Sequence, residues 1–169
     1  MLNDFVRTPS IITDILLQHE VFEGNILEPC CGDGAISDIL KNHDYNVISS
    51  DKFDYGYGEI KNLFQICKQH DNIITNPPFT HQQDVKKHLL RLTKKKLALL
   101  WYVKNLGNEI ETKTSKHLKC IYLFTQKIQW KETKLGWLFG WYVWDKEYEG
   151  DIIIKKIKIK PLPLPSLFQ

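Results

Sequence analysis

The chain has 169 residues, of which 43% are hydrophobic and 25% charged, and its net charge is +3. This length predicts one domain with a core large enough to fold without disulfides or a structural metal. The composition excludes a disordered or collagen-like chain. Residues 1–80 contain 5 basic and 12 acidic residues, whereas residues 81–169 contain 18 and 8. A basic second half suits a polyanion such as nucleic acid, although a solvated lysine-rich surface would give the same charge.

Nothing in the sequence indicates a metal centre, a secretory leader or a membrane segment. The cysteines are Cys30, Cys31, Cys67 and Cys120. They lack CxxC spacing and a His cluster, so we expect reduced thiols and no metal. The N-terminus lacks a basic region followed by an apolar one. The longest apolar run, residues 97–103, is too short to span a bilayer. We therefore expect a cytoplasmic protein without membrane contact.

The first two thirds of the chain alternate between strand-like and helical patterns. Thr8 as N-cap and Pro9 at the first helical position predict a helix over residues 9–19. Apolar runs predict strands over residues 25–28, 45–50, 72–75 and 97–103. Helical spacing predicts helices from Ala35 and over residues 82–95, with a third short element around residues 63–67. This alternation indicates an α/β fold with a mostly parallel, doubly wound sheet.

Charge and hydrophobicity also predict faces and edges. In the helix over 82–95, we expect Val85, Leu89 and Leu92 to face inward. The basic residues Lys86, Lys87, Arg91 and Lys94 are expected to face outward. The last third is strand-like over residues 121–124, 136–145 and 151–160, the last with one wet face at a sheet edge. We expect one domain over residues 1–160, a proline-rich tail over 161–169 and no separate target-recognition domain.

A glycine turn joins the first strand to the second helix. It reads Glu28-Pro29-Cys30-Cys31-Gly32-Asp33-Gly34, and such a turn lets the backbone approach a ligand at a helix start. Asp51 follows the next strand, 19 residues after Gly32, where Rossmann-type folds place a carboxylate for ribose hydroxyls. A plain glycine helix entry and a turn-capping Asp51 are the alternatives.

The most specific motif is Asn76-Pro77-Pro78-Phe79, directly after a buried strand. The prolines end the strand and fix the backbone. They place the Asn76 amide oxygen and the Pro77 carbonyl at the carboxyl end of the sheet, where α/β folds bind ligands. Two such acceptors can bind both hydrogens of a planar amino group and free its lone pair to attack. Phe79 offers a flat face for a base to stack on.

This ordered set resembles the class I S-adenosylmethionine-dependent methyltransferases. It most resembles the small N6-adenine DNA methyltransferases of phages and mobile elements, whose fold is Rossmann-like with an antiparallel C-terminal region. The late run Gly136-Trp-Leu-Phe-Gly-Trp-Tyr-Val-Trp-Asp145 resembles the family's Trp-containing strand. The resemblance implies S-adenosylmethionine as cofactor and Asn76, Pro77, Pro78 and Phe79 as catalytic residues. Implied cofactor contacts are Thr8, Pro9, Glu28, Pro29, Cys30, Gly32, Gly34, Asp51, Lys52, Asn62, Leu63 and Asn76.

The chain departs from the family pattern at Asn62, where an Asp often contacts the cofactor adenine. An amide oxygen can still accept that hydrogen bond. DNA is the expected partner; an RNA adenine substrate, a protein glutamine amide and a non-catalytic cofactor-fold subunit are alternatives. A homodimer or a separate recognition partner could supply the missing recognition domain.

Weaker signals concern nucleic-acid contacts and the tail. Candidate phosphate contacts are Lys86, Lys87, Arg91, Lys94, Lys95, Lys96 and residues 113–119, although exposed lysines are more often simply solvated. The tryptophans Trp130, Trp137, Trp141 and Trp144 fit a buried strand better than base stacking. Residues Ser166–Phe168 faintly resemble peptides that bind replication sliding clamps, although packing or disorder of this tail is the better interpretation.

Overall fold

The computed structural model describes residues 5–107, 116–128 and 138–159. Its helices are α1 (Ser10–His19), α2 (Ala35–Asn42) and α3 (Gln82–Leu92), with 3₁₀ turns η1 (Leu63–Gln65) and η2 (Val103–Asn105). Its strands are β1 (Ile26–Glu28), β2 (Val47–Asp51), β3 (Glu59–Ile60), β4 (His70–Thr75), β5 (Thr93–Tyr102), β6 (Leu118–Phe124), β7 (Phe139–Asp145) and β8 (Ile153–Ile157). None of the helices among these residues is long and apolar enough to cross a membrane.

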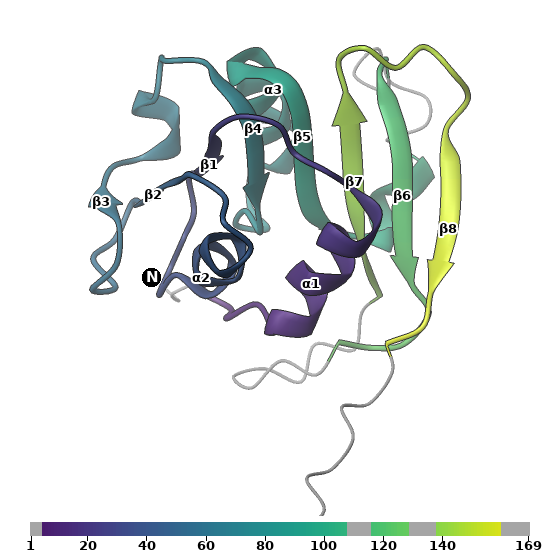
Figure 1. Cartoon of the computed structure of the whole chain (residues 1–169), viewed down its shortest axis with the longest axis horizontal. Helices are drawn as coiled ribbons and strands as arrows, with labels where there is room; N and C mark the ends of the chain where they lie inside the picture. Colours follow the sequence, from purple (N-terminus) through teal and green to yellow (C-terminus); the bar gives the residue numbers. More distant parts are fainter. Residues whose placement is uncertain (1–4, 108–115, 129–137, 160–169) are drawn as a thin grey trace, which may run out of the picture.

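The strands form one sheet in the order β3-β2-β1-β4-β5-β7-β6-β8 (Figure 1). Strand β7 runs antiparallel to both of its neighbours, and the other pairings among the described strands are parallel. The predicted α/β sheet with an antiparallel C-terminal region is therefore confirmed. The last predicted strand lies at the sheet edge as β8, as its alternating pattern indicated.

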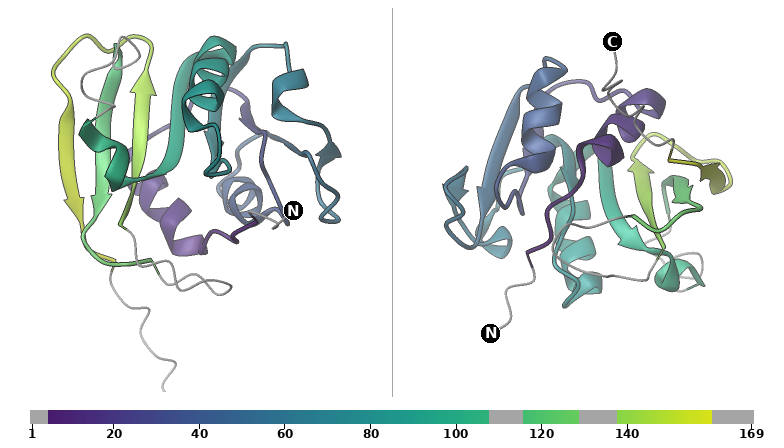
Figure 2. Two further views of the ribbon diagram at one scale, coloured as in Figure 1. Left: turned by 180° about the vertical axis from the view of Figure 1, so that it is seen from behind. Right: turned by 90° about the horizontal axis from the view of Figure 1, so that it is seen from below.

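Helices cover both faces of the sheet. Helices α1 and α2 lie in front in Figure 1 and α3 behind, and the reverse view in Figure 2 shows α3 in front. Two buried clusters reflect these layers: Ile26 and Ile74 pack on the α1–α2 side, whereas their neighbours Leu27 and Ile73 pack on the α3 side. Successive residues of one strand therefore point into the hydrophobic cores on opposite faces of the sheet.

Most element boundaries differ from the prediction by a few residues, and those of α1 and α3 are the most informative. Helix α1 begins at Ser10 with Pro9 as N-cap, and Thr8 makes no capping bond, so its predicted N-cap role is wrong. Helix α3 ends at Leu92 instead of residue 95, and β5 begins at Thr93 opposite His70 of β4. Pairing with β4 thus overrides the helix propensity of the lysines that follow.

The predicted outward face of α3 is correct except at Lys86. Lys87 and Arg91 are exposed, as is Lys94 just beyond the helix. Lys86 is 0% exposed, and its ammonium lies 5.7 Å from the centre of the Trp101 ring. The aliphatic stem of a lysine can lie along an apolar surface, and a cation is attracted to an aromatic face. Helical spacing alone cannot predict this.

The tryptophans that the structure describes belong to the core. Trp141 and Trp144 on β7 are buried, at 0% and 1% exposure, as the strand interpretation predicted. The other two predicted members, Trp130 and Trp137, lie outside the described residues, as do residues 161–169 with the clamp-like tripeptide.

Candidate functional site

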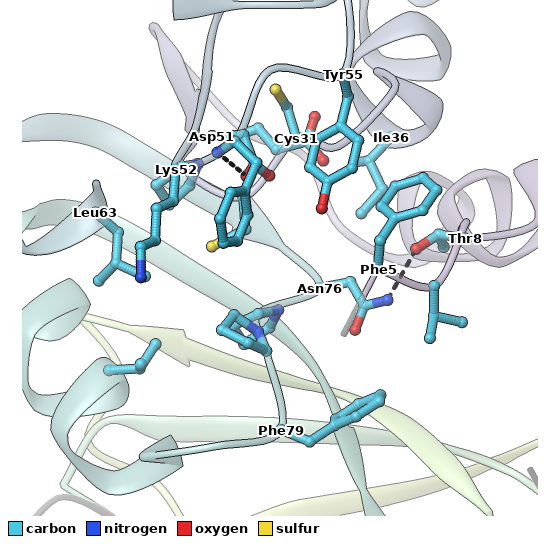
Figure 3. Close-up of a pocket in the computed structure, with 18 of the residues that line it drawn as sticks. Phe5, Thr8, Cys31, Ile36, Asp51, Lys52, Tyr55, Leu63, Asn76 and Phe79 are labelled. Carbon is cyan, nitrogen blue, oxygen red and sulfur yellow. Dashed lines mark hydrogen bonds between the residues drawn. The ribbon is translucent and has the colours of Figure 1, made fainter. Parts of the chain in front are cut away.

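A cleft opens where the parallel strands end. Strand β1 ends at Glu28, β2 at Asp51 and β4 at Thr75, so their following turns meet at one edge of the sheet. The turns surround a cavity of about 240 Å³ (Figure 3). Twelve predicted site residues line it: Thr8, Glu28, Pro29, Cys30, Asp51, Lys52, Asn62, Leu63, Asn76, Pro77, Pro78 and Phe79. Pro9, Gly32 and Gly34, also predicted, do not.

Gly32 and Gly34 shape the turn next to the cleft without lining it. Both have positive φ angles, 52° and 86°. The space that a Cβ atom would occupy is filled by the Phe5 ring at Gly32 and by the Tyr57 ring at Gly34. Glycine is therefore required at both positions, because it permits the turn and lets aromatic rings lie against the backbone.

Asp51 joins the glycine turn to the rim of the cleft. Its Oδ2 accepts a hydrogen bond from the Gly32 N–H at 2.9 Å, and its Oδ1 accepts one from the Phe53 N–H at 3.0 Å. Each carboxylate oxygen has more than one acceptor site, so hydroxyl groups of a ligand can still bind. The two backbone bonds hold the carboxylate in place for this contact.

Glu28 is a buried carboxyl group at the end of β1. Ser37 Oγ donates a hydrogen bond to it, and Ser37 Oγ also lies 2.6 Å from Ser49 Oγ. Burial raises the pKa of Glu28 well above its ordinary value of 4.5, and the charge of Asp51 acts in the same direction. The cleft therefore contains a carboxyl group that favours its neutral form.

The Cys30 and Cys31 thiols are not activated nucleophiles. Burial raises the pKa of the Cys30 thiol far above its ordinary value of 9.0 and that of Cys31 to about 12. A thiol reacts as its thiolate, so neither side chain suits covalent catalysis.

Asn62 lines the cleft but also caps the turn η1. Its Oδ1 accepts from the Phe64 N–H at 3.0 Å, and Gln65 Oε1 accepts from the Asn62 N–H at 3.2 Å. Asn62 thereby fixes the position of Leu63, which packs into the cleft wall. Its amide oxygen has a second acceptor site for a ligand.

Asn76 occupies the floor of the cleft. Its Nδ2 donates to Thr8 Oγ1 at 3.1 Å, the dashed contact in Figure 3. Its Oδ1 is buried and has no hydrogen-bond partner among the described residues. An unpaired buried acceptor is costly, and Asn76 also lines the cleft, so a ligand there can supply the hydrogen bond that Oδ1 lacks.

Phe79 is half-buried beside this floor. Its ring centre lies 4.4 Å from that of Tyr102 and 6.1 Å from that of Phe139. These rings at the ends of β5 and β7 hold Phe79 from the core side. Its ring can therefore act as a fixed platform at the cleft.

An aromatic wall, which the sequence did not reveal, closes one side. Phe5 stacks on Tyr55 with ring centres 4.7 Å apart, and Phe53 meets Tyr55 edge to face at 6.3 Å. Arg7 forms an ion pair with Asp33 across the same side. The signals in the sequence were the aromatic residues flanking Asp51 and the segment Phe5-Val-Arg-Thr8-Pro9, which resembles the family motif before the first strand. Neither predicted that Phe5 stacks on Tyr55. Other unpredicted lining residues are Ile36, Phe64, His81 and Val85.

The predicted phosphate contacts do not gather around the cleft. Lys95 and Lys96 lie near the start of β5, at the opposite edge of the sheet, where they contact Glu23 and Glu20. Lys119 also contacts Glu20. Residues 113–115 lie outside the described part of the chain. Lys52, in contrast, lines the cleft itself.

Comparison with known proteins identifies the fold. No protein-family model and no curated protein matches the sequence. A Listeria monocytogenes protein assigned to the class I S-adenosylmethionine-dependent methyltransferases matches in structure over 99% of this chain and 70% of its own, with 14% identity and a TM-score of 0.63. A Pyrococcus horikoshii protein assigned as an RNA methyltransferase matches over 83% and 84%, with 16% identity and a TM-score of 0.64. A protein assigned as the modification subunit of a type I restriction enzyme from Vibrio vulnificus matches over 97% and 48%, with 12% identity and a TM-score of 0.60. The chain therefore has the Rossmann-like fold of the class I methyltransferases.

Proposed function

We propose that the protein transfers a methyl group from S-adenosylmethionine to the exocyclic N6 of adenine in DNA. The observation that carries this proposal is the buried, unpartnered Oδ1 of Asn76 at the floor of the cleft. It stands next to Pro77 and Pro78, at the carboxyl end of β4. An amino group entering the cleft would supply the missing hydrogen bond.

The lining of the cleft fits this cofactor. Asp51 offers a held carboxylate to ribose hydroxyls, while Leu63 and Phe53 offer apolar surface to an adenine ring. Thr8 and Glu28 add polar groups to the lining. When bound, S-adenosylmethionine supplies an electrophilic methyl group on its sulfonium sulfur, so no nucleophilic side chain is required.

The residues of the chain then act on the amino group. Asn76 Oδ1 and the Pro77 carbonyl accept its two hydrogens, which localises the lone pair on nitrogen. As the nitrogen bonds to the methyl carbon and the carbon–sulfur bond breaks, positive charge develops on nitrogen, and these two dipoles stabilise it. The electron pair of the broken bond stays on sulfur as a neutral thioether, and the nitrogen then loses one proton to water. Phe79, backed by Tyr102, would stack on the base and offset part of the cost of flipping it out of a duplex.

The Asn-Pro-Pro-Phe motif supports methylation of a planar amino group, and the fold shared with the restriction modification subunit supports DNA as the substrate. The fold is equally shared with the RNA methyltransferase. RNA is therefore the alternative that the experiment must separate.

The test is transfer of labelled methyl groups to unmodified DNA and RNA, followed by identification of the methylated base. We expect N6-methyladenine in DNA. The variant Asn76→Ala should lower kcat by about 100-fold or more, because a dipole aimed at the developing charge is lost. The control Glu23→Gln changes an exposed residue at the opposite edge and should leave the rate unchanged. Label in RNA alone, or an active Asn76→Ala variant, would contradict the proposal.

A further inference from the structure

We infer that Thr8 is a positioning residue, which holds the Asn76 side-chain amide by pairing with Nδ2 while Oδ1 is presented to the substrate. The inference rests on the proposed function and adds a role for a residue 68 positions away in sequence. Thr8 Oγ1 is 3.1 Å from Asn76 Nδ2, and it is the polar atom that this nitrogen contacts among the described residues. Thr8 itself is 5% exposed, so water competes little for the contact.

The Thr8 hydroxyl is available for this task because it does not cap α1. The N-cap of α1 is Pro9, whose backbone is extended, with φ −61° and ψ 137°. Its carbonyl oxygen accepts the first helical bond, from the Ile12 N–H at 3.0 Å. The side-chain oxygen of a threonine at the start of a helix usually accepts a capping hydrogen bond from a backbone N–H of the first turn. Here the side chain points into the cleft instead.

Helix α1 places Thr8 through buried contacts with the sheet. Trp141 Nε1 on β7 donates to the Ile12 carbonyl oxygen at 2.8 Å, and both side chains are fully buried. Leu16, one turn further along, is also fully buried. Because α1 is held against β7 in this way, the residue before Pro9 is fixed relative to the end of β4. Thr8, just before α1, and Asn76, just after β4, are thus placed by two packed elements that meet at the cleft.

The contact matters because the two ends of an amide have nearly the same shape. Turning the Asn76 amide by 180° would exchange its oxygen and nitrogen without changing its packing. In that orientation, two N–H donors would face the substrate amino group, and the acceptor would be lost. The substrate amino group needs an acceptor facing it, so the productive orientation has Oδ1 toward the cleft, and Thr8 Oγ1 supplies the acceptor that Nδ2 needs in that orientation. Thr8 therefore acts on the reaction through Asn76, without touching the reacting atoms.

Two substitutions at Thr8 separate this role from packing. Thr8→Val keeps the shape and removes the hydroxyl, whereas Thr8→Ser keeps the hydroxyl and removes a methyl group. At saturating S-adenosylmethionine, we expect Thr8→Val to lower kcat by about tenfold, the size of one hydrogen bond. Thr8→Ser should restore kcat to within about threefold of the wild type. The dissociation constant for S-adenosylmethionine, measured by calorimetry, should stay within about threefold in both variants.

The matched control is Thr13→Val in α1, the helix that follows Thr8. Thr13 is 0% exposed, and its hydroxyl has no hydrogen-bond partner among the described residues. This variant should keep the wild-type kcat. If Thr8→Val instead keeps kcat and only weakens cofactor binding, Thr8 is a cofactor contact and the inference is wrong. If Thr8→Val and Thr8→Ser lose kcat equally, packing explains the effect and the inference is again wrong.

A second readout is independent of turnover. In ¹⁵N-labelled protein, the side-chain NH₂ resonances of Asn76, assigned from the Asn76→Ala spectrum, should shift in Thr8→Val and return in Thr8→Ser. Unchanged resonances in Thr8→Val would overturn the inference even in an inactive preparation. Failure of the proposed function has a different signature, because the wild type would then methylate no amino group while the resonances still shift.

Discussion

Glu28 shows how burial sets the chemistry of a single residue. Its carboxyl group is 1% exposed at the end of β1, and Ser37 donates a hydrogen bond to it. Burial raises its pKa well above 4.5, so the folded protein favours the protonated form. Below pH 4.5 the group is neutral in both folded and unfolded chains. Above that pH the unfolded chain ionises first, so the stability contributed by the neutral carboxyl is lost as pH rises.

This loss of stability with rising pH predicts how the variant Glu28→Gln behaves. Glutamine is neutral at every pH, so we expect the variant to match the wild type near pH 4 and to exceed it near pH 7.5 by more than about 1 kcal/mol in free energy of unfolding. Urea titrations at the two pH values measure this. The control Glu59→Gln, an exposed residue on β3, should show no such pH dependence. A constant difference between Glu28→Gln and wild type at both pH values would exclude a buried neutral carboxyl.

Individual residues also show what the sequence could reveal. Asn76 could be placed, because two prolines after a buried strand mark its carboxyl end. The burial of Lys86 could not be predicted, because it depends on how the helix packs on the sheet, and the local sequence does not show that packing. The partnership of Asn76 with Thr8 could not be predicted either, since no local pattern records a contact between residues 68 apart.

At the scale of elements, Glu20 ties α1 to the antiparallel half of the sheet. Glu20 follows the last residue of α1 and is 3% exposed. It accepts hydrogen bonds from Lys96 on β5 at 2.8 Å, Lys119 on β6 at 3.1 Å and Tyr122 on β6 at 2.7 Å. Burial by itself would raise the pKa of Glu20, but these partners lower it overall. The cluster lies at the opposite end of the strands from the cleft, so it serves the fold and not the reaction.

The cluster predicts a large effect of Glu20→Gln. Because it removes charge-assisted bonds to two lysines, it should lower the free energy of unfolding at pH 7 by about 2 kcal/mol. Since the pKa of Glu20 is lowered, its contribution is complete above pH 4.5 and is lost as pH falls below it. The difference between variant and wild type should therefore shrink toward pH 3.

Glu23→Gln is the matched control for Glu20→Gln. The Glu23 side chain is 81% exposed, and its contact with Lys95 is 3.4 Å long. Such exposed pairs contribute little, so the free energy of unfolding should change by less than about 0.5 kcal/mol. Equal effects of the two substitutions in urea denaturation would show that burial at Glu20 is unimportant.

The boundaries of the elements were harder to predict than their order. Helical spacing in residues 82–95 continues smoothly past Leu92, yet the chain enters β5 at Thr93. The Thr93 hydroxyl donates to the Leu89 carbonyl oxygen at 2.8 Å and closes the helix there. The parallel pairing of β5 with β4 decides the boundary, and a local pattern contains no information about that partner.

For the whole molecule, topology explains why distant motifs form one site. Strands β1, β2 and β4 are parallel neighbours, so the turns after Glu28, Asp51 and Thr75 meet at one edge. Alternating strands and helices were enough to predict this arrangement. The aromatic wall of Phe5, Phe53 and Tyr55 was not predictable, because ring stacking depends on where two loops cross.

The same topology predicts how a cofactor would affect the stability of the whole molecule. The cleft is lined from the segment before α1, from the ends of β1, β2 and β4, and from η1 and α3. A ligand bound there contacts elements that must all be folded. S-adenosylmethionine at 100 times its dissociation constant should therefore stabilise the native state by about 2.7 kcal/mol. In a domain of this length that corresponds to a rise in Tm of about 5–10 °C.

Asp51→Ala distinguishes binding in this cleft from a general solvent effect. The substitution removes the carboxylate that Gly32 and Phe53 hold at the rim, so its own Tm should fall and the ligand-induced rise should disappear. Asp54→Asn changes an exposed carboxylate three residues further along and should keep the full rise. Scanning calorimetry with and without S-adenosylmethionine measures both. An undiminished rise in Asp51→Ala would contradict the proposed ribose contact at the end of β2.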